Sequence, residues 1–386
     1  MTTAAAPIAA SADVIARARE FCATHLKEIA GKLDNENRFP TELLPLLAEE
    51  GFWGLNYPTE YGGAGLDAVT THKVAKEFAK VSAGVALTFH VQWMATDVLL
   101  KYGTEEQKRK YLPDLIQGKK IAAFDISEVQ AGSDMAGIKA EATRTEGGWL
   151  LNGAKYFCTN GGLADIYLVA FKTDPAAGAK GVSMFLIEKG TPGFSIGANE
   201  EKMGCRSAVL TALSFRDCAV GAEALVGKVN EGFKAAMHGL VGGRLGMASM
   251  GLGIAEAALE EAGRYANKRI AFGKPLSALY SVQEMLADMH IKLQAAELLV
   301  FQTAAARDSG RDYSLESSVA KLFVAETVTL CCHNAMQIFG GHGYMKAHAI
   351  ERLARDGRLM DVGVGSSEVL KMVVGMSVAK SMATSS

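Results

Sequence analysis

The stretch Phe-Asp-Ile-Ser-Glu-Val-Gln-Ala-Gly-Ser-Asp-Met-Ala-Gly, residues 124–137, marks the point at which the texture of the chain changes. From residue 12 to about residue 118, apolar side chains recur with the spacing of helices. From about 120 to 227 they form short runs rich in β-branched and aromatic residues, separated by glycine, proline and aspartate as turns require. The sequence therefore predicts a helical segment followed by a small, mainly antiparallel sheet.

Long helical periodicity returns after residue 231. It predicts helices whose lengths suit an antiparallel bundle, at 233–266, 282–309, 315–339 and 366–382. The expected fold class is α+β, mainly α. Its expected parts are an N-terminal helical domain over residues 1–119, a middle β-sheet domain over 120–228 and a C-terminal helical bundle over 229–386. Because a fold does not dictate chemistry, individual residues must identify the function.

Composition argues against several classes of protein. The 386 residues are 49% hydrophobic and 21% charged, which is typical of packed domains and not of a disordered chain. With 40 Lys plus Arg against 42 Asp plus Glu, the net charge of −2 provides no field that would attract nucleic acid or anionic lipid. The six cysteines lack C-x-x-C spacing, no apolar run reaches about 18 residues, and the first ten residues carry no basic segment. We therefore expect a cytoplasmic protein with reduced thiols, no metal site and no membrane span.

The segment Lys-Tyr-Phe-Cys-Thr-Asn-Gly-Gly, residues 155–162, is expected to form a strand that runs into a turn. Phe157 and Thr159 are two residues apart, so the alternation of a strand would place both on one face. An aromatic plane beside a hydroxyl suits a flat heteroaromatic ring with an acceptor at its edge. An ordinary half-buried strand explains the same pattern, so both interpretations stay open at this point.

Two further segments carry glycine where backbone could approach a ligand closely. Lys-Arg-Ile-Ala-Phe-Gly-Lys-Pro, residues 268–275, ends a predicted helix and projects Arg269 and Phe272. Gln-Ile-Phe-Gly-Gly-His-Gly-Tyr, residues 337–344, ends another helix, and Val-Gly-Val-Gly-Ser-Ser-Glu follows at 362–368. Each segment alone is equally compatible with a purely structural helix end.

Taken together and in this order, these segments resemble those of the acyl-CoA dehydrogenase family over about residues 12–379. The resemblance implies an N-terminal helical domain, a middle β-domain and a C-terminal four-helix bundle. It also implies a homo-oligomer, with a tetramer favoured, and one FAD per subunit. The implied substrate is an acyl-CoA thioester, and the implied electron acceptor is an electron-transferring flavoprotein.

The resemblance assigns roles to individual residues. Phe157 takes the place of the aromatic residue that packs on the isoalloxazine, and Thr159 that of the hydroxyl near flavin N5. Arg269 and Phe272 correspond to FAD contacts donated by a neighbouring subunit. The implied cofactor contacts are Ser127, Ser133, Phe157, Thr159, Arg269, Phe272, Gln337, Gly341 and Ser366. The implied substrate contacts are Ser133, Arg244, Gly363 and Val364.

The sequence departs from the family where the catalytic base is expected. Most members carry a glutamate directly before the Gly-Thr/Ser of the catalytic loop, and this chain has Val364 there. A minority carry it one residue before the arginine that Arg244 matches, and that residue here is Gly243. Neither residue can accept a proton. Gly363 stands where many members have a tyrosine that walls the acyl pocket, so we expect a wider cavity at this point.

His90 and Asp97 are the predicted replacements for the missing base. They lie on a predicted helix that corresponds to one lining the acyl chain in the family, and with Met94 they share one helical face. An imidazole, or a desolvated carboxylate of raised pKa, could deprotonate a carbon remote from the thioester. A satisfied wall histidine and an aspartate held by a structural partner explain the same residues. His238 and Glu368 are further candidates of mainly structural character.

We therefore expect an FAD-dependent oxidoreductase of CH–CH donors. Its expected substrate is a cyclic, branched or already unsaturated acyl-CoA that loses its proton away from the usual α-carbon base. One alternative is conventional α,β-dehydrogenation with a base that we did not recognise, and another is a redox-neutral or oxygen-using flavoenzyme on the same scaffold. A non-catalytic subunit is the third, and the retained Thr159 and Arg269 argue against it.

Overall fold

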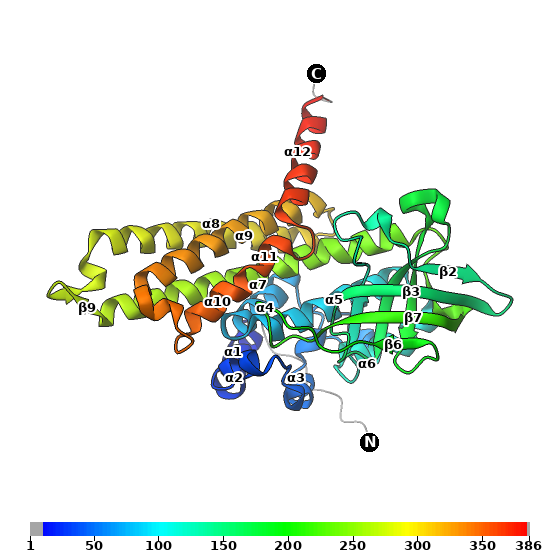
Figure 1. Ribbon diagram of the computed structural model, residues 1–386, viewed down its shortest axis with the longest axis horizontal. Helices are drawn as coiled ribbons and strands as arrows, with labels where there is room; N and C mark the ends of the chain where they lie inside the picture. The colour runs from blue at the N-terminus through cyan, green and yellow to red at the C-terminus, as the bar shows by residue number, and fades with distance from the viewer. Residues whose placement is uncertain (1–10, 384–386) are drawn as a thin grey trace.

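The computed structural model describes residues 11–383 and confirms the expected order of helices, sheet and helices (Figure 1). The helices of the first part are α1 (Ser11–Phe21), α2 (Ala30–Glu36), α3 (Leu44–Glu49), α4 (Ala68–Val81), α5 (Ala83–Tyr102) and α6 (Glu105–Ile116). In Figure 1 the short helices α1, α2 and α3 lie at the bottom of the molecule, and the longer α4 and α5 lie above them, in its middle.

Side-chain caps fix where these helices begin. Asp67 accepts a hydrogen bond from the Thr70 amide at 2.6 Å ahead of α4, and Thr104 and Gln107 form a capping box ahead of α6. Helix α5 carries apolar or small residues on nearly every side and is buried along most of its length. It therefore lies in the centre of the molecule, where it can contact both the sheet and the bundle.

The middle part is an eight-stranded sheet with the order β6-β7-β3-β2-β4-β5-β8, and β1 pairs with β4. Most neighbours are antiparallel, as predicted, whereas β1 runs parallel to β4 and carries the chain from the helices into the sheet. The strands are β1 (Ala122–Asp125), β2 (Glu141–Arg144), β3 (Gly148–Thr159), β4 (Ile166–Lys172), β5 (Val182–Glu188), β6 (Phe194–Ile196), β7 (Leu210–Gly221) and β8 (Leu225–Val226).

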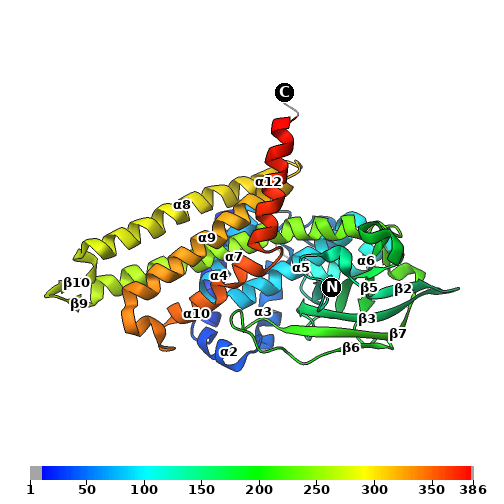
Figure 2. The ribbon, with the colours of Figure 1, turned by 45° about the horizontal axis from the view of Figure 1, so that its top comes forward.

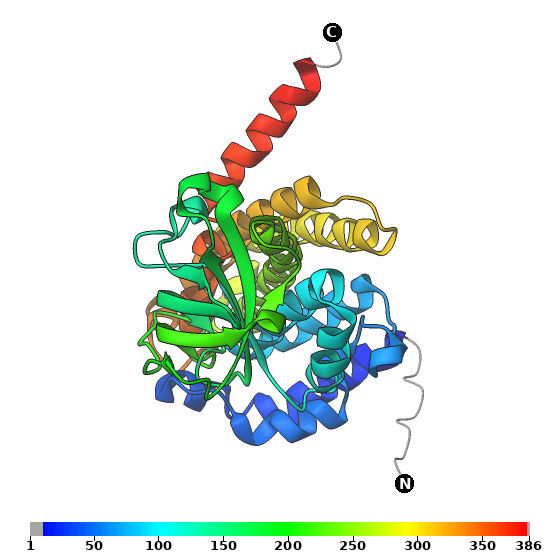
Figure 3. The same ribbon diagram turned by 90° about the vertical axis from the view of Figure 1, so that its right-hand side faces the viewer.

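The C-terminal part is a bundle in which the long helices α7, α8 and α9 lie side by side (Figures 1 and 2). A small hairpin of β9 and β10 joins α7 to α8 at the end of the bundle opposite the sheet (Figure 2). The elements are α7 (Gly232–Lys268), β9 (Ile270–Ala271), β10 (Lys274–Pro275), α8 (Tyr280–Asp308), α9 (Ser314–Phe339), α10 (Ala349–Gly357), α11 (Leu359–Val362) and α12 (Ser367–Ala383). The last helix projects away from the rest, as the end-on view of Figure 3 shows.

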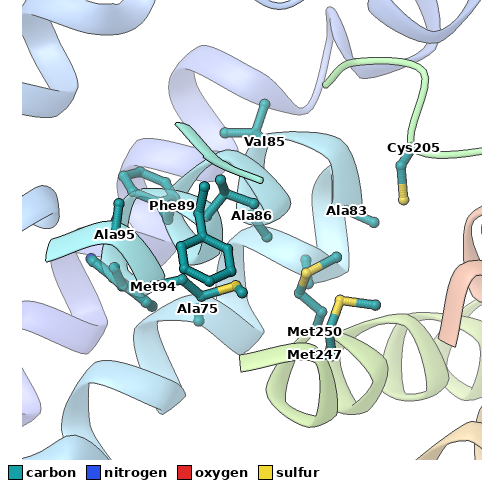
Figure 4. Close-up of a cluster of buried hydrophobic side chains, with 14 of the residues drawn as sticks. Ala75, Ala83, Val85, Ala86, Phe89, Met94, Ala95, Cys205, Met247 and Met250 are labelled. Carbon is teal, nitrogen blue, oxygen red and sulfur yellow. The ribbon is translucent and has the colours of Figure 1, made fainter. Parts of the chain in front are cut away.

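The core joins the three parts where α5 meets α7. Phe89 and Met94 of α5 lie against Met247 and Met250 of α7 in a buried apolar cluster (Figure 4). Glycines on α7 allow the close approach: a Cβ atom at Gly246 would lie 2.6 Å from Nδ1 of His90. Within residues 11–383, no single helix combines the length and apolar composition that crossing a bilayer requires. A bent pair, Ala349–Val362 with Ser367–Ala383, reaches those limits by length and composition alone.

Candidate active site

A cavity of about 690 Å³ lies where the sheet, α5, α7 and the segment before α12 meet. Its apolar wall comes from Met94 of α5 and from Leu240 and Met247 of α7. The end of β1 and the segment after it supply Ser127 and Ser133. These elements are distant in sequence, so the cavity exists only because α5 is held between the sheet and the bundle.

The sheet presents Phe157 and Thr159 to this cavity through a β-bulge. The register between β3 and β7 shifts between Lys155 and Cys158, and Phe157 adopts a left-handed backbone with φ of 66°. A bulge of this kind re-aims a side chain, and Phe157 is accordingly 60% exposed although it belongs to a central strand. An exposed aromatic ring beside a hydroxyl, within a cavity, fits a flat heteroaromatic group.

A buried ion pair fixes the segment around Ser127. The Lys155 ammonium lies 2.7 Å from Oε1 of Glu128, and it also donates to the carbonyl of Ile126. Burial would raise the pKa of Glu128, but Lys155 and the backbone amides of residues 139 and 140 together lower it. The amide of Tyr156 donates to the carbonyl of Ser127, so this ion pair and hydrogen bond join the two walls of the cavity.

Asp125 was not predicted from the sequence, and among the described residues it is the one acid that lines the cavity. Its Oδ1 accepts from the Ser127 amide at 3.0 Å, whereas its Oδ2 is buried without a hydrogen-bond partner. Burial raises the pKa of Asp125 to about 7, against the opposing charge of Lys155. The carboxylate also raises the pKa of the buried Cys158 thiol, although burial contributes more to that shift. The signal in the sequence is an aspartate at the end of an otherwise apolar strand.

The structure does not bring the predicted bases to the cavity. His90 is 2% exposed and packs against Trp93, its ring nitrogens have no hydrogen-bond partner, and burial lowers its pKa to about 3. Asp97 lies 3.0 Å from Nη2 of Arg307 and accepts a hydrogen bond from Tyr57. Of the three residues predicted to share a helical face, His90, Met94 and Asp97, the cavity is lined by Met94 alone. The roles of His90 and Asp97 as bases therefore stay predictions without geometric support. His238 and Glu368 also lie outside the lining.

The loop before α12 lines the cavity with Gly363, Val364, Gly365 and Ser366. Val364 has a φ of 54°, a conformation that a β-branched residue rarely adopts. The buried ammonium of Lys321 donates to the Gly365 carbonyl at 2.7 Å and so holds the loop. A Cβ atom at Gly363 would lie 2.9 Å from Cε of Met247, so Met247 takes part of the space that Gly363 leaves open.

The two positions where a base was expected adjoin each other. A Cβ atom at Gly243 would lie 2.7 Å from Sδ of Met94 and 3.1 Å from Cγ1 of Val364. A carboxylate on either residue would therefore reach the same part of the cavity. In this chain that part is walled by a thioether and a valine side chain.

The remaining predicted cofactor contacts lie at the other end of the molecule. Phe272 lies in the β9–β10 hairpin and Arg269 directly before it, far from the sheet in Figure 2, and Phe272 is 90% exposed. Gln337 and Gly341 lie at the end of α9, and none of these four lines the cavity. Within one chain, these four residues therefore do not lie in the same site as Phe157. No three His, Cys, Asp or Glu side chains are grouped as a metal site requires within residues 11–383.

Comparison with known proteins places these features in context. Family models match in three successive parts: acyl-CoA dehydrogenase N-terminal domain over residues 10–119, middle domain over 123–218 and C-terminal domain over 230–379. A short-chain specific acyl-CoA dehydrogenase of Clostridium acetobutylicum is 39% identical over 358 residues, 92% of this chain and 94% of that protein. The caffeyl-CoA reductase-Etf complex subunit CarC of Acetobacterium woodii is 39% identical over 360 residues, which cover 92% and 95%.

Among solved structures, butyryl-CoA dehydrogenase from Megasphaera elsdenii superposes with a TM-score of 0.94. It is 37% identical in sequence, and the match covers 96% of this chain and 98% of that one. The likeness therefore extends over the sheet, both helical parts and the cavity between them.

Proposed function

This chain belongs to the acyl-CoA dehydrogenase family of FAD-dependent oxidoreductases that act on CH–CH donors, and from that membership we propose a reaction that avoids the usual α-carbon base. Its substrate is a cyclic, branched or already unsaturated acyl-CoA, whose proton leaves from a carbon remote from the thioester. The observation that carries this proposal is the absence of an acid both at Val364, which lines the cavity, and at Gly243, which adjoins Val364.

The residues that would hold the cofactor fit a flavin. Phe157 offers an exposed aromatic face, Thr159 a hydroxyl beside it, and Ser127 and Ser133 polar groups on the opposite wall. When bound, FAD supplies a hydride acceptor. The buried pair of Lys155 and Glu128 keeps these two walls in register, because it ties the segment after β1 to β3.

The acyl group of the substrate would lie between α5, α7 and the loop at 363–366. Met94 and Met247 would exclude water from the reacting carbons, and the backbone N–H of Val364 would donate to the thioester carbonyl without any side chain. The site of a neighbouring subunit would be completed by Arg269, Phe272, Gln337 and Gly341. This agrees with the position of these residues outside the cavity of the chain that carries them. We propose a homotetramer for that reason.

The name of one relative supports the partner. It is a subunit of a caffeyl-CoA reductase-Etf complex, so an electron-transferring flavoprotein is proposed as the electron acceptor of this chain. A cytoplasmic location belongs to the same proposal. One observation favours the alternative of conventional α,β-dehydrogenation: Asp125 is an acid that lines the cavity and has one unpartnered carboxylate oxygen.

Anaerobic spectroscopy tests the proposal. The purified yellow protein is titrated with matched thioesters: straight saturated, branched, cyclic saturated and cyclic unsaturated acyl-CoAs of equal carbon number. We expect loss of the flavin absorbance with the branched or cyclic members and none with the straight saturated ones. Bleaching by straight saturated chains at a comparable rate would return the enzyme to the conventional reaction, and Asp125→Asn would then be expected to abolish it.

A further inference from the structure

Arg244 is a buried cation without a counter-ion. It lies on α7, its side chain lines the cavity, and it is only 6% exposed. Its Nη1 donates to the Ser318 hydroxyl at 3.2 Å, and its Nε is buried without a partner. Among residues 11–383 no carboxylate lies within 4 Å of the guanidinium, in contrast to the partnered Arg307 and Arg355. A buried charge is costly unless it is paired, so an arginine in this state is complementary to a missing anion.

The side chains around Arg244 add positive charge and include no carboxylate that pairs with its guanidinium. The ammonium of Lys321 is buried beside the same loop, where it holds the Gly365 carbonyl. Burial, with a smaller contribution from the positive charge of Arg244, lowers the pKa of Lys321 to about 8, so the two cations interact. The negative charges of Asp361 and Glu368 oppose this shift. Asp361 is already paired with Arg358 at 2.5 Å, and Glu368 is exposed at the start of α12.

The unpaired state follows from the residues that surround Arg244. Lys321 interacts with Arg244 and also donates to the carbonyl of Gly365, so a glutamate at the adjoining position 364 would bring a negative charge near the guanidinium. Valine at position 364 and glycine at position 243 supply no such charge. Asp125, the one acid of the lining, is on β1 and interacts with Lys155. The cavity can therefore gain electrostatic energy only from an anion that the ligand brings.

We propose that Arg244 binds a carboxylate carried on the acyl chain of the thioester substrate. This inference rests on the proposed function, since it takes the cavity to hold an acyl-CoA. Arginine presents two parallel N–H donors that match a carboxylate, and here only one donor is used by the protein. The apolar wall of Met94, Leu240 and Met247 keeps water away, which strengthens a charged hydrogen bond. Neutral acyl chains would leave the guanidinium unpaired and bind less tightly.

Matched thioesters measure this preference. Each pair replaces the terminal carboxylate by an isopropyl group of similar shape: succinyl- with 4-methylpentanoyl-CoA, glutaryl- with 5-methylhexanoyl-CoA, and adipyl- with 6-methylheptanoyl-CoA. Dissociation constants are measured by anaerobic calorimetry on the FAD-loaded enzyme, for the wild type, Arg244→Met, Arg244→Lys and Val364→Glu. Arg109→Gln, an exposed residue of α6, is the control for a lost surface charge.

For at least one pair, we expect the wild type to bind the acidic member about 10- to 100-fold more tightly, the range of a charged hydrogen bond. Arg244→Met should bring the ratio of the two dissociation constants in a pair close to one. Arg244→Lys should keep part of the preference for the acidic member, and Arg109→Gln should keep all of it. Val364→Glu should remove the preference by supplying an internal carboxylate. If the role of Arg244 were purely structural, Arg244→Met would weaken the binding of both members of a pair equally. The ratio of their dissociation constants is therefore informative even if the variant is less stable.

Equal binding of both members by the wild type, or an unchanged ratio in Arg244→Met, would overturn this inference. If neutral thioesters still bind and bleach the flavin, the proposed function survives that result. If no thioester of any pair binds, the proposed function and this inference both fail.

Discussion

Val364→Glu should create α-proton removal in this cavity. The change places a carboxylate where the family keeps its base, at a loop residue that lines the cavity beside Met94 and Gly243. The cavity has about 690 Å³ to receive the longer side chain. Straight saturated acyl-CoAs, which we expect to leave the wild-type flavin oxidised, should then reduce it.

The structure sets the size of this gain. A positioned general base accelerates proton transfer by about 10²–10⁴-fold. Arg244 and Lys321 are both close to the loop, and their positive charges would lower the pKa of the new carboxylate and weaken it as a base. We therefore expect the lower end, about 100-fold, or about 2.7 kcal/mol of barrier at 1.36 kcal/mol per tenfold. The cost in stability should be small, because the valine already occupies an unfavourable left-handed conformation with φ of 54°.

The assay is anaerobic stopped-flow bleaching of the flavin with butyryl-CoA, followed for Val364→Glu, Val364→Gln and Val364→Ala. Glutamine matches the shape and polarity of glutamate but does not accept the proton, and alanine removes the valine methyl groups alone. Acceleration in the glutamate variant only, rising with pH as the carboxylate ionises, supports the reasoning. Equal acceleration by glutamine would show that space or polarity limits the wild type, and our account of the missing base would be refuted.

Three further predictions concern the surroundings of the site. Asp97→Asn should lower the free energy of unfolding by about 3 kcal/mol in denaturant titration, the lower end for breaking a buried pair, because Arg307 loses its carboxylate while its side chain is 21% exposed; a much smaller loss would mean that the pair is solvated. Burial raises the pKa of Asp125 in the folded protein from 3.8 to about 7. The contribution of Asp125 to the free energy of unfolding therefore falls as the pH rises from about 4 to 7. Asp125→Asn should therefore stabilise the protein more at pH 8 than at pH 5 by the same titration, and an equal effect at both would refute the shift. Phe272→Ala should leave the melting temperature of the FAD-free protein unchanged, because the ring is 90% exposed, yet weaken FAD binding by fluorescence titration; unaltered affinity would exclude the neighbouring-subunit role.

Most of the fold could be predicted because periodicity and turn residues decide it locally. The long helices α7, α8 and α9 begin and end within a few residues of the predicted limits. The bulge at Phe157 could not be predicted in this way, because a strict two-residue alternation takes no account of an extra residue in β3. The divisions after residues 119 and 228 stay predictions.

The candidate site was only partly predictable, because helical spacing alone does not say which neighbour a residue meets. His90, Met94 and Asp97 share a face of α5, but helices pack against α5 from more than one direction. Met94 therefore reaches the cavity, His90 lies against α7 at Gly246, and Asp97 meets Arg307 of α8. Asp125 was missed for a related reason, since its place in the wall of the cavity depends on how β1 pairs with β4.

The missing base and the unpaired arginine have one physical origin. A carboxylate at position 364 would serve two purposes, as the acceptor of the α-proton and as a negative charge near Arg244, because Lys321 both holds the adjoining Gly365 and interacts with Arg244. Removing it has two coupled consequences, a cavity that cannot take the α-proton and a cavity that attracts an anion. Val364→Glu should therefore change both properties together, raising the rate with butyryl-CoA and abolishing the preference for acidic thioesters. A variant that gains the rate but keeps the preference would show that Arg244 does not sense the charge at residue 364, and would separate the two proposals.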